Sequence, residues 1–384
     1  MPAERPTRIL IVDDSAVVRS LLRSVVSTDK KLEVASTAAD GASALASLES
    51  VRPDLILLDV EMPIMDGLIT LKQLRSRGYK MPVIMCSSLT QRGAQVTIEA
   101  LASGASDYVA KPRGQDSREA SIRTLARDLI PKIHALTSQA QPQAAARGAA
   151  RPSALLPLAP PRPPSILFAA PSAPSVLPAV LAVGVSTGGP AALDVFLPGL
   201  PAGFPLPVLI VQHMPELFTG LLAERLNNRS KLRVCEAAEG MPVSAGTAYI
   251  ARGNWHLEVV PAAAASARPT LHLSQGPLEN YCRPAADVLF RSAARVYGGG
   301  ALAVVLTGMG SDGLNGSRVI REHGGSVLAQ DQATSIVWGM PGAVAQAGLA
   351  QKVLPLDAIA PEILRMVSRP PAAGEQREAH RLVV

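Results

Sequence analysis

Short apolar segments alternate with segments of helical pattern through most of the chain, and this alternation constrains the fold more than any other feature. In the N-terminal third, the apolar segments are 7–12, 33–36, 54–58, 82–86 and 107–110. Each reads as a strand, and helical segments separate them. Five such β–α units predict a doubly wound parallel sheet, whose ligands bind at the carboxyl ends of the strands.

Polar residues stand at the ends of four of these strands. Asp13 and Asp14 follow the first strand, Asp59 the third, Ser87 the fourth and Lys111 the fifth. Clustered carboxylates repel one another unless a cation neutralises them, and oxygen ligands at an open site suit Mg²⁺. A lysine beside them can hold a transferred phosphoryl oxygen. The alternative, helix-capping aspartates and a solvated lysine, explains each residue singly but not all five together.

Residues 7–125 resemble the receiver domain of two-component response regulators. The segments that carry the resemblance are IVDDS, LLDVEMPIMDG, MCSS and YVAKP. The resemblance implies that Asp59 is phosphorylated. It also implies that Asp13, Asp14 and Asp59 serve a Mg²⁺ ion together with the backbone carbonyl of Glu61.

The same resemblance implies roles for three further residues. Ser87 and Lys111 would contact the phosphoryl group, and Tyr108 would move together with Ser87 on activation. A phosphoryl group adds negative charge and acceptor oxygens, and so biases a loop–helix surface between two arrangements.

A segment of different composition follows. Residues 138–178 contain ten prolines, many alanines and serines, and no acidic residue. This composition predicts an extended, semi-stiff connector without a core. The sequence therefore divides into a receiver-like domain (1–137), a linker (138–178), a second folded domain (179–370) and a tail (371–384).

The net charge of +6 does not indicate a nucleic-acid-binding protein. Half of this excess lies in three arginines of the linker, and neither flanking part carries a basic stripe or a basic segment like a helix-turn-helix. The three cysteines form no CxxC motif, and neither a signal peptide nor an apolar run of membrane-spanning length is present. We therefore expect a cytoplasmic protein that is not inserted in a membrane.

The second part begins with the segment GVSTGGP, in which Ser186 lies between an apolar strand (179–185) and a helix (191–197) with Pro190 in its first turn. Such a turn lifts a side chain clear of the sheet and places the free N–H groups of the helix start beside it. It suits a nucleophile with an oxyanion site, and it equally suits a phosphate cradle. Neither GxGxxG nor GKS/T fits this spacing.

Two more polar residues follow apolar strands of this part. His213 follows the strand at 207–211, and Asp312 lies in the loop after the strand at 301–306. Alternation again indicates a mostly parallel α/β sheet, so Ser186, His213 and Asp312 would meet at one edge. Triads are recognised by geometry, and several chain orders of serine, histidine and aspartate exist.

The remaining elements of this part are predicted from local patterns. Residues 233–275 are rich in strands and turns and predict hairpins packed on the main sheet. Helices are expected at 218–226, 285–296 and 361–367, and a further strand at 326–331.

The segments GVSTGGP, IVQHMP, TGMGSDG, AQD and WGMPGAV resemble the catalytic domain of the chemotaxis protein-glutamate methylesterase/glutaminase family. The resemblance implies that Ser186 is the nucleophile, His213 the general base and acid, and Asp312 the group that orients the imidazole. It further implies an oxyanion role for Met309 and a supporting role for Thr187.

The chain departs from the family pattern at one place. Where the family commonly has His-Arg-Pro, this chain has Cys282-Arg283-Pro284. This departure affects what can be expected of the residues at the rim of the substrate site, and it does not affect the expected triad. A second catalytic nucleophile at Cys282 is disfavoured, because no histidine is evidently paired with it.

Together the two resemblances imply a serine hydrolase, switched on by phosphorylation, that demethylates glutamate methyl esters of methyl-accepting chemoreceptors and also deamidates glutamines. Its phosphodonor would be the sensor histidine kinase of a chemosensory system. We expect the unphosphorylated receiver to cover the Ser186 cleft. The alternative is a non-catalytic response regulator that binds a partner when phosphorylated, which has no need of Ser186, His213 and Asp312 together.

Overall fold

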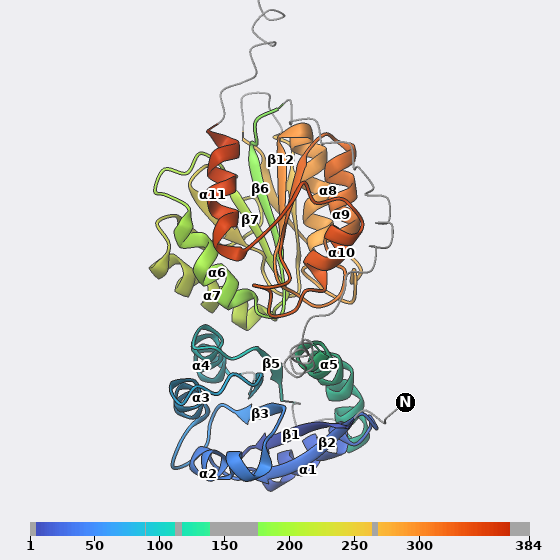
Figure 1. The fold of residues 1–384 in the computed structure, drawn as a ribbon. Coiled ribbons are helices and arrows are strands. Elements are labelled where there is room, and N and C mark those ends of the chain that lie inside the picture. Colours follow the sequence, from blue (N-terminus) through green and yellow to red (C-terminus); the bar gives the residue numbers. More distant parts are fainter. Residues whose placement is uncertain (1–4, 89, 112–116, 139–175, 263–267, 369–384) are drawn as a thin grey trace, which may run out of the picture.

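The computed structural model describes residues 5–88, 90–111, 117–138, 176–262 and 268–368. They form two α/β domains, which lie one above the other in Figure 1. Almost all of the predicted linker (138–178) and the whole of the predicted tail (371–384) lie outside the described residues. The domain boundaries therefore stay predictions.

The N-terminal domain contains a parallel five-stranded sheet with the order β2-β1-β3-β4-β5. Its strands are β1 (Thr7–Val12), β2 (Leu32–Ala38), β3 (Leu55–Asp59), β4 (Val83–Ser87) and β5 (Asp107–Ala110). Its helices are α1 (Ala16–Val26), α2 (Gly41–Val51), α3 (Gly67–Ser76), α4 (Gln91–Ala102) and α5 (Arg118–Ser138). Helices α1 and α5 cover one face and α2, α3 and α4 the other, which confirms the doubly wound prediction.

Local chemistry fixes where α3 begins and thereby supports the end of β3. The Asp66 side chain accepts a hydrogen bond of 2.8 Å from the backbone N–H of Ile69, which caps the helix. A Cβ atom at Gly67 would lie 2.0 Å from the carbonyl oxygen of Asp59, so only glycine allows this close approach. The first turn of α3 therefore packs directly on the strand end that carries Asp59.

The C-terminal domain contains a seven-stranded parallel sheet with the order β14-β13-β12-β6-β7-β9-β8. Its strands are β6 (Val180–Val185), β7 (Val208–Gln212), β8 (Arg233–Glu236), β9 (Thr247–Ile250), β12 (Ala301–Val305), β13 (Ser326–Gln330) and β14 (Lys352–Leu354). Helices α6 (Gly189–Phe196), α7 (Glu216–Arg229) and α11 (Leu356–Val367) cover one face. Helices α8 (Ala286–Tyr297), α9 (Leu314–Glu322) and α10 (Met340–Gln346) cover the other.

The prediction of hairpins for residues 233–275 was only partly right. Strands β8 and β9 are parallel members of the main sheet, because the connection at 237–246 is long enough to return the chain to the same end. The antiparallel pair is formed by β10 (His256–Val260) and β11 (Thr270–Ser274), a separate two-stranded sheet in contact with α8.

The last helix begins earlier than predicted. It starts at Leu356 rather than Pro361, so the proline lies inside it. Ile359, Ile363 and Met366 bury one face of this helix. Their packing outweighs the backbone hydrogen bond that a proline cannot donate.

In both domains, candidate site residues follow two adjacent strands whose connections run to opposite sides of the sheet. In the C-terminal sheet these strands are β6, which is followed by Ser186, and β12, whose following loop carries Asp312. In the N-terminal sheet they are β1, followed by Asp13, and β3, which ends at Asp59. Ligands of open α/β sheets bind between such strands. No helix within the described residues is long and apolar enough to cross a membrane.

Phe290 connects α8 to the sheet beneath the Asp312 loop. Its ring is fully buried. Cβ atoms at Gly184, Gly313 and Gly316 would lie 3.3, 3.4 and 2.6 Å from Phe290 atoms, so these glycines leave the space that the side chain fills. The side chain therefore ties β6, the start of α9 and α8 together.

We predict that Phe290→Ala lowers the free energy of unfolding of the C-terminal domain by about 3–5 kcal/mol, because the substitution leaves a cavity in a packed core. Chemical denaturation monitored by circular dichroism measures the change. Val195→Ala, at a position that is 52% exposed on α6, is the control and should change the value by less than about 0.5 kcal/mol. Equal effects of the two substitutions would contradict this view of the core.

Candidate active site and candidate metal centre

The turn after β6 holds Ser186 by its backbone from two sides. The carbonyl oxygen of Ser186 accepts hydrogen bonds from the N–H of Gly189 (2.8 Å) and from Nε2 of Gln212 (3.0 Å). A Cβ atom at Gly308 would lie 2.8 Å from Cβ of Ser186, so the loop after β12 packs directly against the serine. The Ser186 side chain remains partly exposed at the beginning of α6. The turn thus has the strand–turn–helix form that the sequence predicted.

His213 stands on the neighbouring strand end and is joined to Asp312. Its backbone N–H donates to the carbonyl of Val185 (3.2 Å), and its Nε2 lies 2.7 Å from Oδ2 of Asp312. The Asp312 carboxylate also accepts hydrogen bonds from four neighbours, namely Ala286 N (2.6 Å), Asp287 N (3.0 Å), Gly313 N (3.0 Å) and Asn280 Nδ2 (2.9 Å). Two of these donors are free N–H groups at the start of α8, which favours a negative charge there.

The hydrogen bond between the two side chains lowers the pKa of Asp312 and raises the pKa of His213. Burial opposes the Asp312 carboxylate, yet the hydrogen bond to His213 and those from Asp287 and Ala286 lower the pKa of Asp312. Burial likewise opposes the charged imidazole, yet hydrogen bonds to Asp312 and Cys282 raise the pKa of His213 to about 10. These two hydrogen bonds therefore favour the protonated imidazole, and a protonated imidazole cannot accept the Ser186 proton.

Nδ1, the ring nitrogen of His213 that does not contact Asp312, faces Cys282 rather than Ser186. Nδ1 lies 3.5 Å from Sγ of Cys282. Within the part of the chain that the structure describes, the Ser186 hydroxyl makes no hydrogen bond to His213. The structure therefore joins two of the three predicted triad members and adds a thiol. It also corrects the sequence-based view that Cys282 has no histidine partner.

A tight turn, which the sequence analysis missed, sets the position of Cys282. The backbone N–H of Glu279 donates to the carbonyl of Cys282 (3.1 Å), and the N–H of Cys282 donates to the carbonyl of Glu279 (2.8 Å). Asn280 and Tyr281 adopt positive φ angles of 52° and 62°. Asn280 tolerates this conformation well, and its side chain bonds Asp312. The Asn280-Tyr281 pair was the available signal for such a turn.

The N-terminal domain contacts the residue next to Ser186. The Thr187 hydroxyl donates a hydrogen bond of 2.6 Å to Oδ2 of Asp107 at the start of β5. Oδ1 of Asp107 pairs with Nζ of Lys132 at 2.9 Å. Thr187, for which the sequence implied support of the nucleophile, is thus engaged by the other domain. Asp107 had not been singled out from the sequence.

Aromatic and apolar contacts extend this domain contact. The ring of Tyr108 stacks on Phe218 of α7 with centroids 4.8 Å apart, and Nζ of Lys132 lies 5.0 Å from the Tyr108 centroid. Helix α4 contacts α6 and α7, as Figure 1 shows. Met309 packs against the N-terminal domain's core cluster, which also includes Val337. The loops around Ser186 and Met309 therefore lie against the N-terminal domain.

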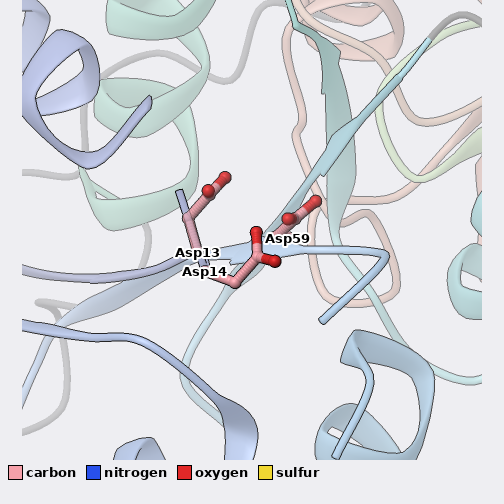
Figure 2. A group of neighbouring side chains, drawn as sticks. All are labelled: Asp13, Asp14 and Asp59. Atoms are coloured by element: carbon pink, nitrogen blue, oxygen red, sulfur yellow. The ribbon is translucent and has the colours of Figure 1, made fainter. Parts of the chain in front are cut away.

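The three predicted aspartates gather at the other strand edge. Figure 2 shows Asp13, Asp14 and Asp59, which offer carboxylate oxygens within 4.8 Å of one another. Nζ of Lys111 lies 2.7 Å from Oδ2 of Asp13 and 2.7 Å from Oδ1 of Asp59. Asp13 and Asp59 are buried, whereas Asp14 is exposed. An all-oxygen set open on one side suits Mg²⁺, so these residues fit the ion that the sequence analysis expected.

Neighbouring charges at this edge affect the pKa values of Asp59 and Lys111. Burial raises the pKa of Asp59 to about 6, with Asp13 adding to the rise and Lys111 opposing it. Burial opposes the Lys111 ammonium, but hydrogen bonds to Asp13 and Asp59 raise the pKa of Lys111. A further positive charge at this site would favour ionised Asp59, which is the form that can attack a phosphoryl group.

The remaining predicted residues of this domain lie near the same edge with other partners. Ser87 is buried, donates to the carbonyl of Ser88 (3.1 Å) and accepts from Thr97 (2.8 Å). The Glu61 side chain is exposed and lies 3.7 Å from Nε of Arg92, so it does not enter the aspartate cluster. The expected role of its backbone carbonyl and that of the Ser87 hydroxyl stay predictions.

Comparisons with known proteins find matches for both domains. A family model described as CheB methylesterase matches residues 181–363, and one described as Response regulator receiver domain matches residues 9–123. A protein-glutamate methylesterase/protein-glutamine glutaminase of Nocardioides sp. is 48% identical over 94% of this chain and 96% of its own. One of Trichodesmium erythraeum is 46% identical over 94% of this chain and 99% of its own. The crystal structure of the Thermotoga maritima CheB methylesterase catalytic domain is 41% identical, covers 50% of this chain and all of its own, and has a TM-score of 0.48.

The hydrogen-bonding of His213 predicts its titration. In the unphosphorylated chain we expect a pKa of about 10 against an ordinary value of 6.5. The stability that this shift contributes is complete below pH 6.5 and is lost as pH rises to about 10. NMR titration of the His213 ring protons measures the pKa. Asp312→Asn should lower it because the charged acceptor is lost, and an ordinary pKa in the unsubstituted chain would contradict the arrangement.

Proposed function

The chain belongs to the CheB methylesterase family, and from this premise we propose that it is a phosphorylation-activated protein-glutamate methylesterase and protein-glutamine glutaminase. Its substrates are glutamyl methyl esters and glutaminyl amides on methyl-accepting chemoreceptors. The observation that carries the proposal is the joining of His213 and Asp312 beside the Ser186 turn, at the point where the strand order of the C-terminal sheet reverses. Removing methyl groups from receptors gives sensory adaptation.

The reaction uses Ser186 as nucleophile and His213 as base. Nδ1 of His213 takes the Ser186 proton while Oγ attacks the ester or amide carbonyl, because Nε2 is held by Asp312. Backbone N–H groups beside Ser186 and in the loop that carries Met309 stabilise the oxyanion. The N–H of Gly189 is not one of them, because it donates to the carbonyl of Ser186. The imidazolium then protonates the leaving methanol or ammonia, and water releases glutamate and Ser186.

This mechanism requires two changes from the arrangement described above. His213 must lose the proton that its raised pKa retains, and Nδ1 must exchange Cys282 for Ser186 as its neighbour. The exchange of Cys282 for Ser186 removes one of the two hydrogen bonds that raise the pKa of His213. The N-terminal domain holds Thr187, the residue next to Ser186, so the domain-docked form is the inactive form and separation of the domains frees the Ser186 turn.

Phosphorylation of Asp59 by the sensor histidine kinase of a chemosensory system drives the separation. Asp13, Asp14, Asp59 and the carbonyl of Glu61 would hold Mg²⁺, which would neutralise charge on the transferred phosphoryl group. The Lys111 ammonium holds a phosphoryl oxygen in exchange for its present carboxylate partners.

The signal reaches the active site through β5 and its neighbours. Ser87 turns its hydroxyl to the phosphoryl group, and Tyr108 moves with it, away from its stacking contact with Phe218. The adjacent Asp107 then loses its hydrogen bond to Thr187. Because Thr187 follows Ser186 directly, the same movement uncovers the nucleophile.

A partner-binding module without catalysis is the competing function. It is not favoured, because binding alone does not require a buried carboxylate held by α8 against His213 beside a serine turn. The two functions differ in the product released.

We predict that purified protein releases methanol from methylated receptor membranes, and that a small phosphodonor with Mg²⁺ increases the rate. Ser186→Ala should lower the stimulated rate by at least about a thousandfold, because the nucleophile is lost. Asp59→Asn should retain the basal rate and lose the stimulation. Release that persists in Ser186→Ala would exclude this nucleophile, and no release under any condition would favour the binding module.

The domain contact yields a separate prediction. Asp107→Ala removes the acceptor of the Thr187 hydroxyl, a hydrogen bond to a charged group that contributes about 1.5–3 kcal/mol. The docked form is weakened accordingly, and methanol release without phosphodonor should rise by about tenfold or more.

Asp128→Ala is the matched control for this substitution, because Asp128 is an exposed aspartate of α5 paired with its neighbour Arg127. It should leave the basal rate unchanged. An unchanged or lower basal rate in Asp107→Ala, with the fold retained, would show that the contact does not restrain the enzyme.

A further inference from the structure

We propose that Cys282 is a redox-sensitive thiol whose oxidation by a peroxide switches the esterase off. The site is the row formed by Cys282 Sγ, the His213 imidazole and the Asp312 carboxylate. The modification itself depends only on this geometry, whereas its effect on turnover rests on the proposed function.

The geometry is that of an activated thiol. Sγ of Cys282 lies 3.5 Å from Nδ1 of His213, and Nε2 of the same ring lies 2.7 Å from Oδ2 of Asp312. A histidine oriented by a carboxylate is the usual partner of a reactive cysteine, because the ring accepts the thiol proton and the carboxylate stabilises the resulting imidazolium. The raised pKa of His213 is consistent with a ring that keeps this proton.

The surroundings of Cys282 hold it in place and leave it reachable. The turn from Glu279 to Cys282 is closed by two backbone hydrogen bonds, and Asn280 ties it to Asp312. Cys282 itself is partly exposed, and the preceding Tyr281 is 96% exposed. A small oxidant can therefore reach Sγ without disturbing the fold.

The other two cysteines of the chain lie in different surroundings. Cys86 is buried in the N-terminal sheet, and burial raises its pKa. Cys235 is partly exposed, like Cys282, but burial raises its pKa as well. The thiolate is the form that reacts. Cys235 therefore provides an internal comparison, because its exposure is similar and no imidazole contacts it among the described residues.

The chemical step is balanced as follows. The Cys282 thiolate attacks one oxygen of hydrogen peroxide, the O–O bond breaks, and the imidazolium of His213 protonates the leaving hydroxide to water. The sulfur loses two electrons and becomes a sulfenic acid, and the peroxide gains them. Two molecules of an added thiol reverse the step, yielding the free cysteine, a disulfide of the added thiol and water.

Oxidation removes the base from catalysis. Nδ1 of His213 is the nitrogen that must receive the Ser186 proton, and in the oxidised protein a sulfenic oxygen lies against it. The oxygen adds a hydrogen-bonding group where the Ser186 hydroxyl has to enter. Esterase activity is thereby lost while the fold is retained.

The first test measures modification alone. Full-length protein is exposed to hydrogen peroxide in the presence of dimedone, which traps sulfenic acids, and labelling of Cys282 and Cys235 is followed by peptide mass spectrometry. We expect Cys282 to react at least about tenfold faster than Cys235. His213→Gln should slow labelling of Cys282 and leave that of Cys235 unchanged. Equal rates at the two cysteines, or an unchanged Cys282 rate in His213→Gln, would overturn the proposal.

The second test links modification to turnover. Methanol release should fall in step with labelling of Cys282, and dithiothreitol should restore it when dimedone is omitted. After treatment with hydrogen peroxide, the Cys235→Ala variant should lose as much activity as the unsubstituted chain. Loss of activity without oxidation of Cys282, or full activity after its oxidation, would contradict the switch. If the untreated protein released no methanol, the proposed function would fail, while the labelling rates would still decide the thiol site.

Discussion

The hydrogen bond between His213 and Asp312 is the interaction on which the proposed chemistry of the C-terminal domain depends. Asp312 is held by N–H groups at the start of α8 and by Asn280, so its carboxylate has a fixed direction. It occupies Nε2 of the imidazole and leaves Nδ1 as the nitrogen available for proton transfer. The partner that faces Nδ1 then decides what the site does. In this structure that partner is Cys282.

The contact between the domains acts on the same site from the other side. Asp107 holds Thr187, Tyr108 stacks on Phe218, and Met309 packs against the N-terminal domain's core cluster. Asp107 and Tyr108 lie on β5, which pairs with β4, the strand that ends at Ser87. A change at the strand ends therefore has a short route to the residue beside the nucleophile. If phosphorylation of Asp59 favours separation of the domains, as we propose, then separation in turn favours the phosphorylated form at equilibrium.

Most of the fold could be predicted from the sequence, because parallel α/β sheets leave a direct pattern of apolar strands with polar ends. The positions of Ser186, His213 and Asp59 follow from that pattern. What the sequence did not show depends on chain segments that meet only in three dimensions. The turn at Asn280 brings Cys282 to His213 across 69 positions, and Asp107 meets Thr187 across 80. The parallel pairing of β8 with β9 was missed because local alternation does not reveal strand direction.

The most direct measurement of the central claim is hydrogen–deuterium exchange of the full-length protein before and after phosphorylation of Asp59, read by mass spectrometry. Domains that separate on phosphorylation predict faster exchange in the loop that follows Ser186 and in α7 (Glu216–Arg229), with exchange in β6 and β12 unchanged. The Asp59→Asn chain, treated in the same way, should show no change. Unchanged exchange in those segments, with phosphorylation of Asp59 verified by mass, would contradict control of the active site through the domain contact.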